Sequence, residues 1–124
     1  MNILLDTHAL IRWLDDRAPR RLARLLAKPQ TIIAVSIVTP WEIAIKPQLG
    51  FQPTQIAEAI EGLGARLLTV HLANVEKLGS LPSPPQHRDP FDRMLIAQAL
   101  SERYAIASAD ERFRLYPGLN VIWD

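Results

Sequence analysis

The sequence predicts an α/β domain in which a parallel β-sheet is covered by helices on both faces. Short apolar runs alternate along the chain with segments whose apolar residues recur at helical spacing. This alternation is typical of β-α-β units, whose strands are parallel and are buried on both faces. The 124 residues fit one domain, which we expect to span residues 1–124.

Five runs are the expected strands. The first stops at Asp6 and Thr7, and its three residues are all apolar, as in a fully buried strand. The second is rich in β-branched residues, which favour extended backbone. In chain order the expected strands are residues 3–5, 31–35, 67–70, 105–107 and 121–123.

Proline, glycine and capping residues mark the expected helix ends. Thr39 is expected to cap the third helix, with Pro40 at its first helical position. Residues 81–85 read Leu-Pro-Ser-Pro-Pro, which favours a rigid connector over a polyproline ligand. The expected helices are residues 9–14, 19 to before 29, 40 to about 47, 53–62, 71–78 and 90–103.

Composition excludes several classes of protein. The absence of cysteine excludes disulfides and thiolate metal sites. No apolar run approaches the roughly 20 residues that cross a bilayer, and the N-terminal segment lacks the basic start of a secretory signal. We therefore expect a cytoplasmic protein with no membrane partner. The net charge of +1 is too small to indicate nucleic-acid binding by itself.

One short stretch is strongly basic. The simpler interpretation is the solvated face of an amphipathic helix, with Leu22, Leu25 and Leu26 turned inward. A surface that faces phosphates or a partner protein is the alternative. The basic residues are Arg17, Arg20, Arg21, Arg24 and Lys28.

Five acidic residues stand where strands end or helices begin. Asp6 directly follows the first expected strand, and Asp110 follows the fourth. Glu42 lies in the first turn of the helix after the second strand, and Asp89 and Asp92 open the long helix before the fourth. Ligands of such sheets bind beyond the carboxyl ends of the strands. If the first, second and fourth strands are neighbours, all five acids meet at one site.

Each acid also has a purely structural interpretation. Asp6, Asp89 and Asp110 can cap helices, and Glu42 with Lys46 can form a surface pair worth about 0.3 kcal/mol. Their joint placement is harder to explain in this way. Two carboxylates about 4 Å apart repel by about 4 kcal/mol at an effective dielectric constant near 20, so a cluster needs protons or cations. Oxygen ligands favour Mg²⁺ or Mn²⁺, which can support phosphodiester cleavage.

Four sequence blocks carry a family resemblance. They are Leu-Asp-Thr-His-Ala-Leu at 5–10, Trp-Glu-Ile-Ala-Ile-Lys at 41–46, His-Arg-Asp-Pro-Phe-Asp-Arg at 87–93 and Ser-Ala-Asp at 108–110. In order and spacing they resemble VapC-type toxins of the PIN-domain family. The resemblance implies a three-layer PIN fold with a central parallel five-stranded sheet flanked by helices. It also implies Mg²⁺ or Mn²⁺, cleavage of RNA, a homodimer and a neutralising antitoxin.

The resemblance assigns roles residue by residue. Asp6, Asp92 and Asp110 match acids that anchor metal, and Thr7 and Ser108 match hydroxyl positions that support the acids. The positions that match the full catalytic set are Asp6, Glu42, Asp89, Asp92 and Asp110. The sequence departs from the family pattern at Pro47, because the family usually continues the helix at this point. Proline inside a helix costs about 3 kcal/mol. We expect the helix that carries Glu42 to end early.

The histidines, and the arginines beside the acids, indicate less about the site. His8, His71 and His87 are far apart in the sequence, so we expect no metal site built on histidines. His8 either lines the rim of the acid site or serves a local structural role. Arg88 and Arg93 flank the acids, and a salt-bridge role and a weak RNA phosphate contact are both open.

Trp13, Trp41 and Trp123 stand among apolar residues, so we expect them in the core. An apolar groove between the early helices is expected to receive an antitoxin helix.

Two other functions remain as alternatives. An aspartyl phosphatase would need a second acid where His8 stands, which argues against that enzyme class. A PIN-like module that binds RNA or a partner without catalysis is the second alternative.

Overall fold

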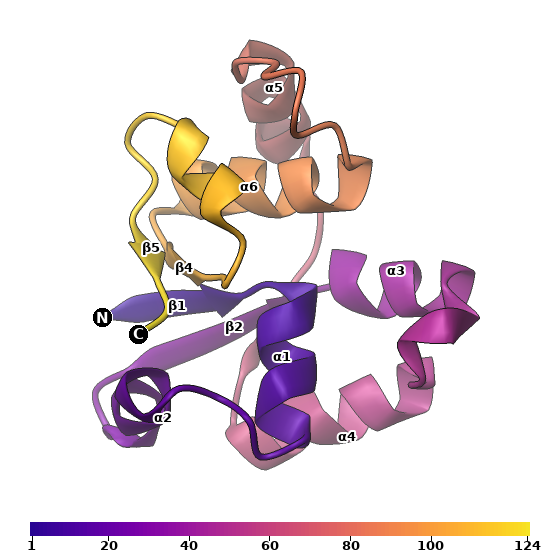
Figure 1. Cartoon of the computed structure of the whole chain (residues 1–124), viewed down its shortest axis with the longest axis vertical. Coiled ribbons are helices and arrows are strands. Elements are labelled where there is room, and N and C mark those ends of the chain that lie inside the picture. Colours follow the sequence, from indigo (N-terminus) through magenta and orange to yellow (C-terminus); the bar gives the residue numbers. More distant parts are fainter.

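A five-stranded parallel sheet forms the centre of the structure, with its strands in the order β3-β2-β1-β4-β5 (Figure 1). The computed structural model describes all residues, 1–124. Every strand lies within two residues of its predicted position, and every neighbouring pair is parallel, as predicted. The strands are β1 (Asn2–Leu5), β2 (Ile32–Ser36), β3 (Arg66–Leu68), β4 (Ala105–Ala107) and β5 (Val121–Ile122).

Helices cover both faces of this sheet. The helices are α1 (Thr7–Leu14), α2 (Arg20–Ala27), α3 (Val38–Ile45), α4 (Pro53–Leu63), α5 (Leu72–Ser80) and α6 (Pro90–Glu102), with short 3-10 turns at Pro47–Leu49 and Glu111–Leu115. Helices α1, α2 and α4 pack on one face, and α5 and α6 lie on the other (Figure 1). Successive β1 residues alternate between the two apolar layers, Ile3 and Leu5 on one side and Leu4 on the other. The predicted three-layer α/β fold is confirmed.

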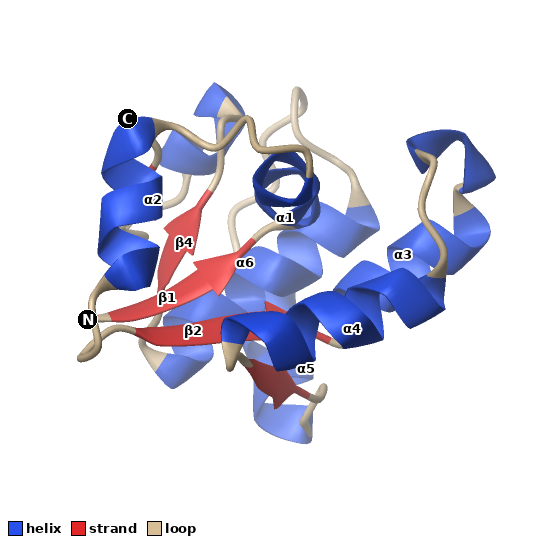
Figure 2. Cartoon of the chain, turned by 90° about the horizontal axis from the view of Figure 1, so that it is seen from below, coloured by secondary structure: helices blue, strands red, loops and turns tan.

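The strand order places the predicted acidic residues at one edge of the sheet. Strand β1 lies between β2 and β4, which is the arrangement that the convergence of the acids requires. Figure 2 shows β1 and β4 running in the same direction, with α1 beginning just beyond the end of β1. Residues that follow these strands therefore lie close together in space.

The start of α3 differs from the prediction. Thr39 does not cap this helix, because the helix begins at Val38 and the Ser36 hydroxyl accepts the Val38 N–H at 3.0 Å. Pro40 falls within the first turn, where a missing N–H leaves no helical bond unmade. Thr39 is fully buried, and its hydroxyl oxygen lies 3.2 Å from that of Thr7. Thr39 therefore packs beneath the acid cluster and does not cap the helix.

Helix α3 ends early, as Pro47 predicts. Its last residue is Ile45, and Lys46 closes the helix by donating its backbone N–H to the Glu42 carbonyl at 2.9 Å. A 3-10 turn follows and stops at Gly50, whose φ of 82° is readily accessible only to glycine. Glu42 lies a full turn before this break, so the break leaves its position intact.

The tryptophans and the basic stretch have different outcomes. The core prediction is wrong for Trp41, whose exposed fraction is 57 %, because it stands on the outer side of α3 and packs edge-to-face on Phe91. Trp13 and Trp123 are only half-buried. In α2, Leu22 and Leu26 are buried while the basic residues are exposed, which confirms an amphipathic helix with a basic outer face. No helix of the chain combines the length and apolar character needed to cross a bilayer.

Candidate active site

Asp6 leaves the end of β1 and stands at the centre of the site. Its backbone N–H donates to the Ala107 carbonyl at 3.1 Å, and its side chain caps α1 by accepting the Ala9 N–H at 2.7 Å. The exposed fraction of Asp6 is only 3 %. Burial raises the pKa of this carboxyl to about 6, and the Ser108 hydroxyl and the Ala9 N–H oppose part of that rise. The predicted capping role is real, but a buried acid with a raised pKa needs a further explanation.

Asp110 follows β4 and faces the same site. The Ser108 hydroxyl accepts the Asp110 backbone N–H at 3.1 Å, and the same hydroxyl opposes part of the rise in the pKa of Asp6. Arg112 binds both oxygens of Asp110, with Nη2 2.6 Å from Oδ2 and Nε 2.9 Å from Oδ1. These hydrogen bonds lower the pKa of Asp110 below its usual value. The sequence analysis missed Arg112, although a basic residue two positions after a capping acid was a usable signal.

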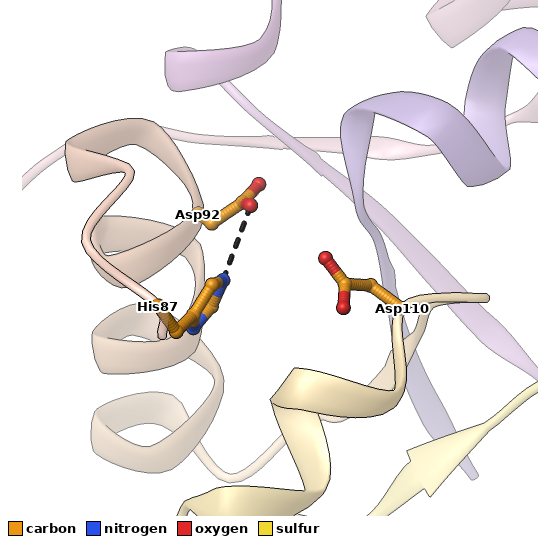
Figure 3. Close-up of side chains that lie close together, drawn as sticks. All are labelled: His87, Asp92 and Asp110. Carbon is orange, nitrogen blue, oxygen red and sulfur yellow. Dashed lines mark hydrogen bonds and ion pairs between the residues drawn. The ribbon is translucent and has the colours of Figure 1, made fainter. Parts of the chain in front are cut away.

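Asp92 stands in the first turn of α6, beside a histidine that the sequence analysis did not include in the site. The Nε2 atom of His87 lies 3.2 Å from Oδ2 of Asp92, and Asp110 faces this pair from the other side (Figure 3). One ligand atom from each of the three residues lies within 4.8 Å of the others. Burial raises the pKa of Asp92, and the charge of Asp89 adds to that effect. The sequence analysis expected no metal site built on histidines and gave His87 no role, but the fold places its ring against Asp92.

Glu42 and Asp89 form a second pair of acids, held together by a lysine. The Nζ atom of Lys46 donates to Oε2 of Glu42 at 2.6 Å and to Oδ2 of Asp89 at 3.2 Å. Thr7 donates to the other oxygen of Glu42 at 2.7 Å, and the exposed fraction of Glu42 is 1 %. Asp89 caps α6 by accepting the Phe91 N–H at 2.8 Å. The pair of Glu42 and Lys46 is therefore a partly buried contact, with Glu42 fully enclosed, rather than the surface pair considered above.

Four of the five predicted acids line one cavity of about 350 Å³. Glu42 is the exception, because it lies buried behind Asp89 and Lys46. His8 lines the cavity, as one of its two interpretations expected. The lining residues are Asp6, His8, Arg12, Asp89, Asp92, Ala109, Asp110, Arg112 and Trp123.

The two arginines predicted beside the acids make other contacts. Arg93 donates to the Pro82 carbonyl at 2.8 Å and to the Tyr116 hydroxyl at 2.9 Å, and it forms no ion pair with an acid. Arg88 is exposed and lines a small hollow with Arg93 and His87. The salt-bridge interpretation is wrong for both residues, because the acids find Lys46 and Arg112 instead.

An apolar groove lies between the end of α1 and the length of α4, apart from the acid cavity. Its volume is about 420 Å³, and Trp13, Leu14, Phe51 and Ala59 form its apolar wall. Gln55, Glu58 and Gly62 complete the lining. The groove stands between early helices, where an apolar groove was expected.

The donor set of the cavity suits a hard divalent cation. Asp6, Asp92 and Asp110 bring carboxylate oxygens from three different elements to one space. Such oxygens are the ligands that Mg²⁺ and Mn²⁺ prefer. A divalent cation would also stabilise the ionised form of Asp6, which burial disfavours. The residues present therefore fit a metal of this kind.

The fold and the site together define an α/β protein with a carboxylate site beyond the ends of parallel strands. The chain matches the model of the PIN domain over residues 3–119, and it belongs to that family. A search of curated proteins gave no significant match.

Several solved structures share this fold. VapBC2 from Rickettsia felis, bound to a DNA fragment from its promoter, matches with a TM-score of 0.76 and 16% identity over 100% of both chains. DNA-bound VapBC from Salmonella typhimurium matches with a TM-score of 0.73 and 17% identity, covering 98% of this chain and 97% of that one. FitAcB from Neisseria gonorrhoeae matches with a TM-score of 0.67 and 19% identity, over 97% of this chain and 96% of that one. At these identities the matches establish a common fold.

Proposed function

We propose that this chain is a divalent-metal-dependent endoribonuclease and the toxin of a type II toxin–antitoxin module. The observation that carries the proposal is the meeting of Asp6, Asp92 and Asp110 in one cavity of a PIN domain. We take residues 1–124 as a single PIN domain that acts on RNA in the cytoplasm. The residues that we assign to catalysis are Asp6, Glu42, Asp89, Asp92 and Asp110.

Asp6, Asp92 and Asp110 would hold Mg²⁺ or Mn²⁺. When bound, such an ion supplies an acidified water and neutralises charge on the leaving oxygen of a phosphodiester. Asp89 lines the same cavity and helps to hold the ion or its water. Glu42 lies behind Asp89 and Lys46 and helps to hold the ion or its water indirectly, because Thr7 and Lys46 bind both of its oxygens.

Basic residues around the cavity are suited to the phosphates of RNA. Arg12 and Arg112 line the cavity directly, and Arg88 is exposed near the start of α6. Contacts of this kind position the nucleic acid and weaken as salt concentration rises. Arg93 is largely committed to Pro82 and Tyr116, so we expect a smaller RNA contribution from it.

The partners follow from the fold and its relatives. The similar structures from Rickettsia felis and Salmonella typhimurium are VapBC proteins, and another from Klebsiella pneumoniae is described as a toxin–antitoxin complex. We propose that a cognate antitoxin places an amphipathic helix in the groove between α1 and α4. Exposed apolar side chains on α3 and α5, among them Trp41, Ile45, Leu72 and Val75, support a homodimer.

The decisive experiment measures RNA cleavage by the purified chain with Mg²⁺ or Mn²⁺, with EDTA and with phosphatase substrates as a control. Asp6→Asn and Asp92→Asn should each abolish cleavage while the protein stays folded. Glu61→Gln removes an exposed acid of α4 and should leave cleavage unchanged. Full activity in either aspartate variant would refute the site. RNA or partner binding without any cleavage would establish the non-catalytic alternative.

A further inference from the structure

A buried histidine at the edge of the acid cluster has no role in the chemistry proposed so far. His87 has an exposed fraction of 1 %. A buried polar ring costs free energy unless its nitrogen atoms find partners. Both do: Nδ1 lies 2.9 Å from the Tyr116 hydroxyl, and Nε2 lies 3.2 Å from Oδ2 of Asp92. The imidazole therefore joins a tyrosine to one of the acids of the cavity.

These hydrogen bonds have one direction that satisfies every group. The Asp92 carboxylate can only accept, so Nε2 of His87 donates to it. In the neutral ring Nδ1 then accepts, and the Tyr116 hydroxyl donates to Nδ1. The Tyr116 oxygen in turn accepts from Nη1 of Arg93 at 2.9 Å. Donation thus runs from Arg93 through Tyr116 and His87 to Asp92.

The histidine ring is held firmly in this position. It packs against Phe113, with 5.2 Å between ring centroids, and against Tyr116, with 5.5 Å between centroids. Both of these neighbours are buried. The ring therefore has little freedom to turn its Nε2 atom away from Asp92.

The proline-rich segment at residues 81–85 anchors two members of the chain of hydrogen bonds, Arg93 and His87. The His87 backbone N–H donates to the Pro84 carbonyl at 3.1 Å. Arg93 donates to the Pro82 carbonyl at 2.8 Å. A stiff segment thus holds the donor at one end of the network and the imidazole near the other.

We propose that His87 is a positioning residue for the metal site, fixed by Tyr116 and Arg93, and that it orients the Asp92 carboxylate toward the cation. The inference rests on the proposed metal-dependent function. Oδ1 of Asp92 accepts no hydrogen bond from the chain, so it is the oxygen left for a metal ion. Figure 3 shows Asp110 facing Asp92 across the space in which such an ion would lie. Hydrogen-bond partners of metal ligands typically change metal affinity by about 10-fold to 100-fold.

The test measures Mn²⁺ binding by the EPR signal of the free ion, with thermal stability recorded separately. His87→Leu removes the donor, and His87→Gln keeps an N–H donor in nearly the same place. Tyr116→Phe removes only the hydroxyl that fixes the ring. Tyr104→Phe is the matched control, because Tyr104 belongs to the same apolar layer but lines a different hollow.

We expect His87→Leu to raise the Kd for Mn²⁺ by about 10-fold or more and Tyr116→Phe to raise it by a smaller factor. His87→Gln should recover most of the affinity, and Tyr104→Phe should match wild type. An unchanged Kd in folded His87→Leu and Tyr116→Phe, with normal binding by wild type, would overturn the positioning role alone. If His87→Leu does not fold, Tyr116→Phe decides.

Two further results would also overturn the inference. Pulsed EPR of the Mn²⁺ complex should show no directly bound imidazole nitrogen, because His87 acts through Asp92. Direct coordination by His87 would mean that this residue is a metal ligand and not a positioning residue. Failure of wild type to bind Mn²⁺ at all would refute the metal-dependent function together with this inference. Normal binding by wild type with an unchanged Kd in the variants would refute only the inference.

Discussion

Replacing Asp6 with asparagine should stabilise the metal-free protein at neutral pH. Asp6 is buried, and the raised pKa means that the fold disfavours its ionised form. Asparagine removes the charge and keeps a side-chain oxygen that can cap α1 at the Ala9 N–H. The variant should therefore gain stability although it loses the proposed activity.

The magnitude follows from the pKa. One pKa unit corresponds to about 1.4 kcal/mol, so a rise from 3.8 to about 6 means that ionised Asp6 destabilises the fold by at most about 3 kcal/mol above pH 7. Below pH 3.8 the carboxyl is protonated in both folded and unfolded chains, and this cost vanishes. It grows as the pH rises from about 3.8 to about 6, and at pH 5 it is about half of its full value.

The assay is urea unfolding in EDTA at pH 7.5 and pH 5, with thermal melts in parallel. The free-energy gain of Asp6→Asn should approach 3 kcal/mol at pH 7.5, which corresponds to roughly 10 °C in Tm for a chain of this length. Glu61→Gln makes the same charge change at an exposed position and should have little effect. The reasoning is refuted if Asp6→Asn is no more stable than wild type at pH 7.5, or if its advantage fails to shrink at pH 5.

Three further predictions concern the same cluster. Lys46→Met should lower the free energy of unfolding by about 2 kcal/mol in urea titrations, since it leaves the buried charge of Glu42 without its partner; a neutral result would contradict the pairing. Arg112→Ala should tighten Mn²⁺ binding by about twofold to fivefold at low salt, because the guanidinium competes for Asp110, and weaker binding measured by calorimetry would reverse that interpretation. Mn²⁺ affinity should fall as the pH drops through about 6, where Asp6 gains its proton, and a flat pH profile would exclude Asp6 as a ligand.

Local signals in the sequence were sufficient for most of the architecture. Apolar runs located all five strands, and Asp89 with Pro90 marked the start of α6, because caps and first-turn prolines act on the nearest backbone groups. Pro47 correctly indicated the early end of α3 for the same reason. The start of α3 was misplaced, because Ser36 and Thr39 are equally good capping residues, and only the folded structure shows that Ser36 accepts the Val38 N–H while Thr39 contacts Thr7.

The sequence by itself also determined which acids stand at strand ends and helix starts, since those positions depend on local chain direction. Only the tertiary structure decided what each acid contacts. Lys46 reaches Asp89 across 43 positions of sequence, and His87 became a neighbour of Asp110 only because α6 packs against β4. Strand order and side-chain burial depend on the packing of the whole chain, and no short pattern encodes them.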